Sequence, residues 1–246
     1  DRMFCILPFE VDFFKSLDYP VDYVGNPSVD SVSAFIESEK KNPDTFLKDN
    51  GLTAKPILAI LAGSRKAEIK QNLPTMLSVA AGFPEFQLVI AGAPGLTPDD
   101  YKQVKRENPG VEIVYKQTYR LLQHASVALV TSGTATLETA LFRVPQVVCY
   151  YVGGGRLVNF VFDHFFHVPY ISLVNLIAGQ EVVQELFGAK FSRKKIHDEL
   201  KKIIDDTTYR EKMFEGYDFV ISLLGEPGAS SRTARLMVES LKQSEP

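Results

Sequence analysis

Short apolar runs alternate with amphipathic segments through the middle of the chain. Each run is four to five residues long and almost continuously hydrophobic, as expected of strands buried on both faces of a parallel sheet. The predicted strands are residues 57–61, 87–91, 112–115, 127–130 and 146–150. Between the first two, apolar residues recur at helical spacing from Ile69 to Ala80. Repeated strand–helix units of this length predict an α/β fold with an open, Rossmann-like parallel sheet and helices on both faces.

The last third of the chain is predicted to be a helical tail. Ser192 is a suitable N-cap for a segment whose apolar residues keep helical spacing as far as Ile204. Residues 207–223 and 229–243 also read as helices, and the Gly-Glu-Pro-Gly sequence at 225–228 separates them.

The start of the chain has a different pattern. Residues 3–8 predict a strand, and a short helix is expected near residues 10–17. The sequence "YVGNP" at 23–27 is typical of a linker. Pro27 keeps its predecessor out of the α region, and Gly25 frees the backbone.

A domain boundary is therefore expected at this linker. Residues 1–25 would be the remnant of a preceding domain with its linker, and residues 26–246 would form the main domain. Because the sequence opens on Asp1 and runs at once into a strand-like segment, we expect it to be a fragment of a longer protein.

Composition and charge narrow the function classes. With 246 residues, 45% of them hydrophobic and 23% charged, the chain resembles ordinary soluble globular proteins. Its net charge of −3 gives no basic field, so no nucleic-acid partner is expected. No apolar stretch is long enough for a transmembrane helix. Cys5 and Cys149 lie in apolar runs without a C-x-x-C motif, which predicts buried free thiols; no metal or other cofactor is expected.

The first candidate for chemistry is "ILAGSRKAEI" at 60–69, where a strand ends in Gly63-Ser64-Arg65 and a charged helix follows. A strand, a glycine turn and a helix N-terminus form a geometry that binds phosphate. The motif is neither a dinucleotide fingerprint nor a P-loop. Arg65 is suited to pair with a phosphate, although it could instead only pair with Glu68 on the helix surface.

The second candidate is "TSGTATLE" at 131–138, again a turn between a strand and a helix. Its hydroxyls and free backbone N–H groups, together with the helix dipole, favour a diphosphate. Glu138 lies one turn into the helix, where a carboxylate can accept from both hydroxyls of a ribose. The alternative is an ordinary turn with a glutamate that complements the dipole. The predicted ligand groups here are Thr131, Ser132, Gly133, Thr134 and Glu138. Both turns end sheet strands, where open α/β folds bind ligands.

Several blocks of the sequence together resemble lipid-A-disaccharide synthases. They are "CILPFEVDFF…VDYVGNP", "LAGSRKAEI", "TSGTATLETAL", "VPQVVCYY" and "VNLIAGQEVVQEL", in that family's order from about residue 3 to residue 190. The resemblance implies the C-terminal, donor-binding domain of a glycosyltransferase-B fold. It further implies transfer from UDP-2,3-diacylglucosamine to 2,3-diacylglucosamine 1-phosphate, with release of UDP.

The resemblance also assigns roles to individual residues. Gly63 and Ser64 would lie near the diphosphate, and Arg65 would neutralise the charge that grows on departing UDP. Asn175 would lie near the donor sugar, with Gln180 and Glu181 opening the next helix. The uracil is expected near residues 115–120.

Other parts of the reaction are expected outside this chain. In the family, the general base, the acceptor site and the membrane-facing surface belong to the N-terminal domain. The resemblance implies a peripheral enzyme at the cytoplasmic face of the inner membrane of a Gram-negative bacterium. It also implies a possible homodimer formed by exchange of C-terminal parts.

Two other functions fit the same turns. One is a UDP-N-acetylglucosamine 2-epimerase, and the other is a non-catalytic nucleotide-sugar binding module. Ser132 lacks a His-Asp context, which disfavours a hydrolase triad.

Further candidates are interpreted as structural. His164 and His167 lack a third metal ligand, and the acidic pairs at 99–100 and 205–206 are typical of solvated helix ends. The aromatic segment 157–168 is expected to pack on the sheet, with contact to acyl chains or to a partner subunit as the alternative.

Overall fold

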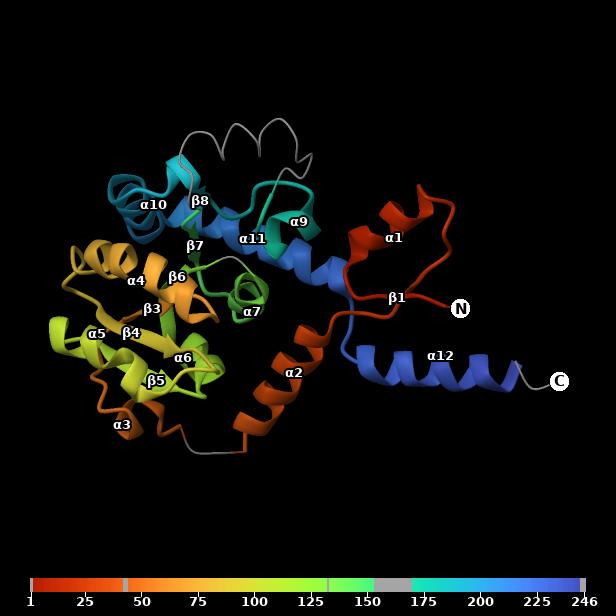
Figure 1. The fold of residues 1–246 in the computed structure, drawn as a ribbon, viewed down its shortest axis with the longest axis horizontal. Coiled ribbons are helices and arrows are strands. Elements are labelled where there is room, and N and C mark those ends of the chain that lie inside the picture. The colour runs from red at the N-terminus through yellow and green to blue at the C-terminus, as the bar shows by residue number, and fades with distance from the viewer. Residues whose placement is uncertain (1, 42–43, 132, 153–169, 244–246) are drawn as a thin grey trace.

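A six-stranded parallel sheet forms the centre of the computed structural model, which describes residues 2–41, 44–131, 133–152 and 170–243 (Figure 1). The strands are β3 (Ile57–Leu61), β4 (Gln87–Gly92), β5 (Glu112–Tyr115), β6 (Ala125–Val130), β7 (Gln146–Tyr150) and β8 (Glu185–Phe187). Their spatial order is β5-β4-β3-β6-β7-β8. The order therefore reverses between the adjacent strands β3 and β6, and this is where doubly wound sheets open a crevice for ligands.

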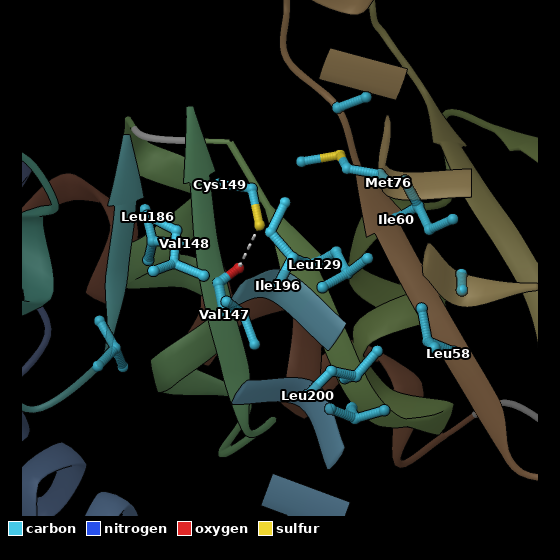
Figure 2. Packing of buried hydrophobic residues seen from close by; sticks show 14 of the residues in the cluster. Leu58, Ile60, Met76, Leu129, Val147, Val148, Cys149, Leu186, Ile196 and Leu200 are labelled. Atoms are coloured by element: carbon cyan, nitrogen blue, oxygen red, sulfur yellow. Dashed lines mark hydrogen bonds between the residues drawn. The ribbon is translucent and has the colours of Figure 1, made fainter. Parts of the chain in front are cut away.

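The larger hydrophobic core extends to both faces of the sheet, because it includes Val147 and Val148, neighbours along β7 whose side chains point to opposite faces. Its helical members come from α4 (Lys66–Ala80), α7 (Thr134–Leu141), α9 (Leu173–Ala178), α10 (Arg193–Asp205) and α11 (Thr207–Leu224). Figure 2 shows Leu58 and Ile60 of β3 in this core, together with Met76 of α4 and Ile196 of α10.

Cys149 lies in this core with no exposed surface, and its thiol faces the Val147 carbonyl oxygen at 3.7 Å (Figure 2). Burial raises the pKa of the Cys149 thiol, so this group stays protonated and unreactive. Cys5 is also buried and free, which confirms the prediction for both thiols.

A smaller cluster lies on the other side of β3, where Ile57, Ala59 and Leu61 alternate with Leu58 and Ile60. Phe46 of α3 (Phe46–Asp49) and Leu121 and Leu122 of α6 (Thr118–His124) pack against the alternate side chains of the strands. Two more short elements, η1 (Pro98–Tyr101) and α5 (Lys102–Glu107), lie between β4 and β5, and η2 (Gly188–Lys190) follows β8.

The N-terminal residues lie outside the six-stranded sheet. β1 (Phe4–Cys5) and β2 (Asp22–Tyr23) make a two-stranded parallel sheet around α1 (Pro8–Lys15), and α2 (Pro27–Glu39) follows directly. The Asn26 side chain caps α2 by accepting from the Ser28 N–H at 2.8 Å. The division into residues 1–25 and 26–246 stays a prediction.

The terminal helix α12 (Ala229–Gln243) is attached to this N-terminal region rather than to the sheet, and both chain ends lie on the same side of the molecule (Figure 1). Asp30 of α2 accepts hydrogen bonds from the backbone N–H groups of residues 228–230. Arg232 donates from Nε to the Val24 carbonyl oxygen at 2.8 Å. A Cβ on Gly25 would lie 2.2 Å from the Arg232 guanidinium, so the linker needs glycine at this point.

Two predicted elements differ from the structure. The predicted strand at 3–8 is only two residues long, because Pro8 occupies the first turn of α1. The helix predicted to open at Gln180 and Glu181 is wrong: residues 181–184 are not helical, and the next element is strand β8, which pairs with β7. Buried Val183 and Leu186 anchor this segment to the sheet, so tertiary packing overrides its local helical pattern.

Candidate functional site

A cavity of about 520 Å3 opens where the sheet order reverses. Its wall includes Gly63, Ser64 and Arg65 from the turn after β3, and Gly133, Thr134 and Glu138 from the turn and helix after β6. With Thr131, which also lines the cavity, the structure brings together seven of the residues that the sequence singled out. Ser132 lies outside the described residues.

In the turn after β3, two backbone N–H groups are already bonded to a side chain of the following helix, α4. Glu68, in the first turn of α4, accepts through Oε2 from the Ser64 N–H at 3.0 Å and from the Arg65 N–H at 3.3 Å. Its Oε1 lies 3.4 Å from Nη1 of Arg65. The expected alternative, an Arg65–Glu68 ion pair, is thus present, although the Arg65 side chain is 82% exposed.

Gly63 makes this arrangement possible. Its φ of 125° is unfavourable for other residues. An added Cβ would also lie 2.8 Å from both Cβ and Oε2 of Glu68. Glu68 was missing from the predicted ligand groups, although a glutamate at the third helical position is a recognisable capping signal.

The turn after β6 differs, because the N-terminus of α7 has no capping side chain among the described residues. Gly133, with a φ of 135°, is the N-cap of α7, and among the described residues no side chain caps this helix end. A Cβ on Gly133 would meet no described atom within 4 Å. The first N–H groups of a helix have no partner within the helix, so this terminus is available to an anion.

Thr131 adds a buried hydroxyl beside the second turn. Its backbone N–H donates to the Leu61 carbonyl oxygen at 2.8 Å, which ties the ends of β6 and β3 together. The side chain lines the cavity and is only 2% exposed. Among the described residues its Oγ1 has no hydrogen-bond partner. A buried hydroxyl without a partner costs free energy that a bound ligand or water can recover.

Glu138 is held by a tyrosine that the sequence analysis did not single out. Tyr119 donates its hydroxyl to Oε1 of Glu138 at 2.7 Å, and both side chains line the cavity. The rings of Phe35 and Phe142 pack against Tyr119 with centroid distances of 5.4 and 5.3 Å. Burial raises the pKa of the Glu138 carboxyl, and the hydrogen bond from Tyr119 acts in the opposite direction.

A second cavity adjoins the first through Thr118 and Tyr119, which line both. Its other lining residues are Phe35, Lys116, Gln117 and Arg120. This is the segment where the uracil is expected, and that expectation stays a prediction.

Asn175 has a structural environment and is absent from the cavity wall. Its fully buried amide donates to the Val183 carbonyl oxygen at 2.8 Å and to Glu185 at 2.9 Å. Its Oδ1 accepts from the Val182 and Val183 N–H groups. The side chain therefore closes the turn between α9 and β8, and its contact with a donor sugar stays a prediction that this geometry does not support.

Glu181 is exposed and accepts a 3.3 Å hydrogen bond from Gln184, also away from the cavity wall.

A residue that the sequence analysis missed is Asn72 of α4, which is 1% exposed. It accepts from the Tyr151 N–H at 2.8 Å and donates to the Ala62 carbonyl oxygen at 3.4 Å. Asn72 thereby couples the first turn to the end of β7.

The acidic pairs interpreted as helix ends have that role. Asp100 caps the segment at Thr97 and pairs with Lys66 at 2.7 Å, and the Lys66 contact is the main cause that lowers the pKa of Asp100 to about 2. Asp206 caps α11, and Asp205 pairs with Lys201.

Metal-binding clusters and membrane spans were searched within the part of the chain that the structure describes. No group of three or more His, Cys, Asp or Glu side chains there could hold a metal. No helix there is long and apolar enough to cross a membrane. His164, His167 and the aromatic segment 157–168 lie outside the described residues.

The family model and the curated relatives that match this chain point to the same family. A family model described as lipid-A-disaccharide synthetase matches residues 1–235. The lipid-A-disaccharide synthases of Myxococcus xanthus and Syntrophus aciditrophicus are 35% and 33% identical, over 98% and 100% of this chain. The chain spans 63% and 64% of those relatives, less than two thirds of their length.

Solved structures share the fold at low sequence identity. The UDP-GlcNAc 2-epimerase of Neisseria meningitidis, solved with UDP-GlcNAc, aligns with a TM-score of 0.68 at 18% identity, covering 99% of this chain and 62% of that one. A glycotransferase of kitacinnamycin aligns with a TM-score of 0.50 at 15% identity, covering 76% and 43%. These similarities concern the fold alone, and they confirm the predicted class, a Rossmann-like open parallel sheet of glycosyltransferase-B type.

Proposed function

Because the chain belongs to the lipid-A-disaccharide synthetase family, we propose that its cavity binds the UDP part of UDP-2,3-diacylglucosamine. The sugar would be transferred to 2,3-diacylglucosamine 1-phosphate, giving lipid A disaccharide 1-phosphate and UDP. The observation that carries this proposal is the single cavity shared by two glycine turns at the point where the strand order reverses.

Each group of the nucleotide has a proposed partner. The diphosphate lies at the open N-terminus of α7, where backbone N–H groups and the helix dipole attract an anion. Glu138, oriented by Tyr119, accepts from the ribose hydroxyls. The uracil enters the second cavity beside residues 116–120.

Arg65 acts on the leaving group in this proposal. Negative charge on the diphosphate grows as the glycosidic bond breaks, and the exposed guanidinium can move to meet it. Protein groups supply the positive charge, so UDP is expected to bind without a divalent metal.

The remaining parts of the reaction are proposed to lie in the portion of the longer relatives that this chain does not match. That portion would supply the general base, the acceptor site and contact with the inner membrane at its cytoplasmic face. A homodimer that exchanges C-terminal parts is also part of the proposal. α12 is suited to such an exchange because it contacts α2 and the linker rather than the sheet.

Calorimetry with UDP tests the binding site. Glu138→Ala should weaken UDP binding by about 1.5–3 kcal/mol, the range for hydrogen bonds to a charged group, and leave pyrophosphate binding nearly unchanged. Glu199→Ala is a matched control, because Glu199 also accepts from a tyrosine, Tyr209, at 2.6 Å but lies outside the cavity wall. Unchanged UDP affinity in Glu138→Ala would reject the ribose assignment, and a strict need for Mg²⁺ would reject metal-free binding.

Two activity measurements separate the alternatives. A UDP-N-acetylglucosamine 2-epimerase, the activity named for the Neisseria protein, would produce the manno epimer from UDP-N-acetylglucosamine. A pure binding module would turn over neither substrate. Transfer of acylated glucosamine by the complete protein would exclude both.

A further inference from the structure

A carboxylate is built into the wall of the cavity where a diphosphate is proposed to bind. Glu68 lines the cavity with a side chain that is 20% exposed. Three features hold it in place: the hydrogen bonds from the Ser64 and Arg65 N–H groups, the ion pair with Arg65, and the close approach to Gly63.

This placement weakens the attraction that the turn after β3 would otherwise have for phosphate. The Glu68 carboxylate accepts from the Ser64 and Arg65 N–H groups of that turn and partly neutralises Arg65. A diphosphate on α7 therefore competes with Glu68 for the guanidinium and is repelled by the carboxylate itself.

The repulsion depends on the charge of the ligand. The diphosphate of a UDP-sugar is a diester and carries about two negative charges. Free UDP has a terminal phosphate that ionises near neutral pH, so it carries close to three. A fixed carboxylate thus disfavours the product more than the donor.

We propose that Glu68 is an internal counter-anion that weakens binding of UDP relative to UDP-sugar and so favours release of the product. This inference rests on the proposed function, because it requires UDP in the cavity. A merely structural cap would leave the balance between the two ligands unaltered.

Glu68→Gln tests this idea, because glutamine keeps the capping hydrogen bonds and removes only the charge. Titration calorimetry of the 246-residue chain should show UDP binding about three- to tenfold tighter in the variant, as expected for removal of one partly screened charge. The gain for UDP-N-acetylglucosamine should be smaller.

Glu10→Gln is the matched control. Glu10 caps α1 in the same way, accepting from the Ile6 and Leu7 N–H groups at 3.1 and 2.9 Å, and it is absent from the cavity wall. The UDP affinity of the Glu10→Gln variant should equal that of the wild type.

The outcomes separate this inference from the proposed function. Unchanged or weaker UDP binding in Glu68→Gln would overturn the counter-anion role, as would an equal gain for both ligands. Absence of UDP binding in every variant, including the wild type, would overturn the proposed function and this inference with it.

Discussion

The two strand–turn–helix units β3–α4 and β6–α7 look alike in sequence and differ in what their helix N-termini can bind. In the first, Glu68 occupies the backbone N–H groups of the turn. In the second, the corresponding helical position is Thr136, whose hydroxyl donates back to the Gly133 carbonyl oxygen at 2.8 Å. In the proposed site the turn after β6 therefore offers backbone donors to the ligand, whereas the turn after β3 contributes through the Arg65 side chain.

A glycine turn before a helix is therefore not by itself an anion site. The third residue of the helix decides whether the N-terminus is already satisfied by the chain. An acidic residue there competes with any external anion, and a threonine does not.

The largest effect, a loss of turnover, is expected when Arg65 of the first unit is replaced. In the complete enzyme, Arg65→Ala should lower kcat more than it raises the donor KM, because the interaction strengthens as charge develops on UDP. Loss of one such contact typically costs about 2.7–4 kcal/mol, or roughly 10²–10³-fold in rate. Arg65→Lys should recover only part, since an ammonium lacks the planar fork. Steady-state kinetics with the acylated donor measures both, and a normal kcat in Arg65→Ala would exclude the leaving-group role.

A carboxylate added to the N-terminus of the second unit should weaken UDP binding. Ala135 is the second residue of α7 and lines the cavity. Ala135→Asp puts a carboxylate at the open terminus and should weaken UDP binding by about 2 kcal/mol, roughly thirtyfold. The helix itself should not lose stability, because an acidic residue in the first turn complements the dipole.

Ala135→Asn adds the same bulk without the charge and serves as the comparison. If both variants lose UDP binding equally, steric blocking rather than charge would be responsible. Thermal unfolding of each variant shows whether the fold is kept.

The glycines of the two turns should differ in stability when replaced by alanine. Both have a left-handed φ, so both substitutions strain the backbone. Only at Gly63 does the added Cβ also collide with a neighbour, Glu68. Gly63→Ala should therefore cost about 1 kcal/mol more than Gly133→Ala in the free energy of unfolding. Urea titration measures the difference, and equal costs would show that Glu68 moves aside freely.

The smallest expected effect concerns Tyr119, which supports the second unit. Tyr119→Phe removes a hydrogen bond that opposes the effect of burial, so the pKa of Glu138 should rise further. Ribose hydroxyls need an ionised acceptor, so UDP binding should be lost as pH falls through this raised pKa, and at a higher pH in the variant. At neutral pH the loss should be only about 0.5 kcal/mol, at the low end for a hydrogen bond.

UDP affinity should be measured against pH for the wild type and for Tyr119→Phe. The titration of UDP itself affects both profiles equally, so it cancels when they are compared. Identical profiles would show that Tyr119 does not tune Glu138. For folding the sign is reversed, because a carboxyl whose folded pKa is raised favours the folded state only when protonated. Its contribution is present below the ordinary pKa and is lost as pH rises through the folded value.

Much of the fold was predictable because the sheet is buried on both faces. Strands β3, β5 and β7 have the predicted bounds, since their continuous apolar runs have no other stable environment. β8 was not predictable from its own residues. It contains the buried Glu185, whose carboxylate accepts from the Ile171 and Ser172 N–H groups, and such long-range partners are invisible in a local pattern.

The location of the candidate site was predictable from the sequence, but many of the side-chain contacts within it were not. Strand ends and glycine turns located Gly63, Gly133 and Glu138 in one cavity. The pairing of Tyr119 with Glu138 spans 19 residues and depends on how α6 packs beside α7, so spacing alone could not indicate it. The buried position of Asn175 is likewise a result of tertiary packing.

The attachment of α12 to the linker has a consequence for the order in which the chain folds. The hydrogen bonds from Gly228 to Asp30 and from Arg232 to Val24 join residues 198 and 208 positions apart. Contacts of such separation carry a large loop-closure entropy until the intervening chain is compact. During synthesis Val24 and Asp30 therefore emerge long before Gly228 and Arg232, and they gain these partners only once the chain between them is compact.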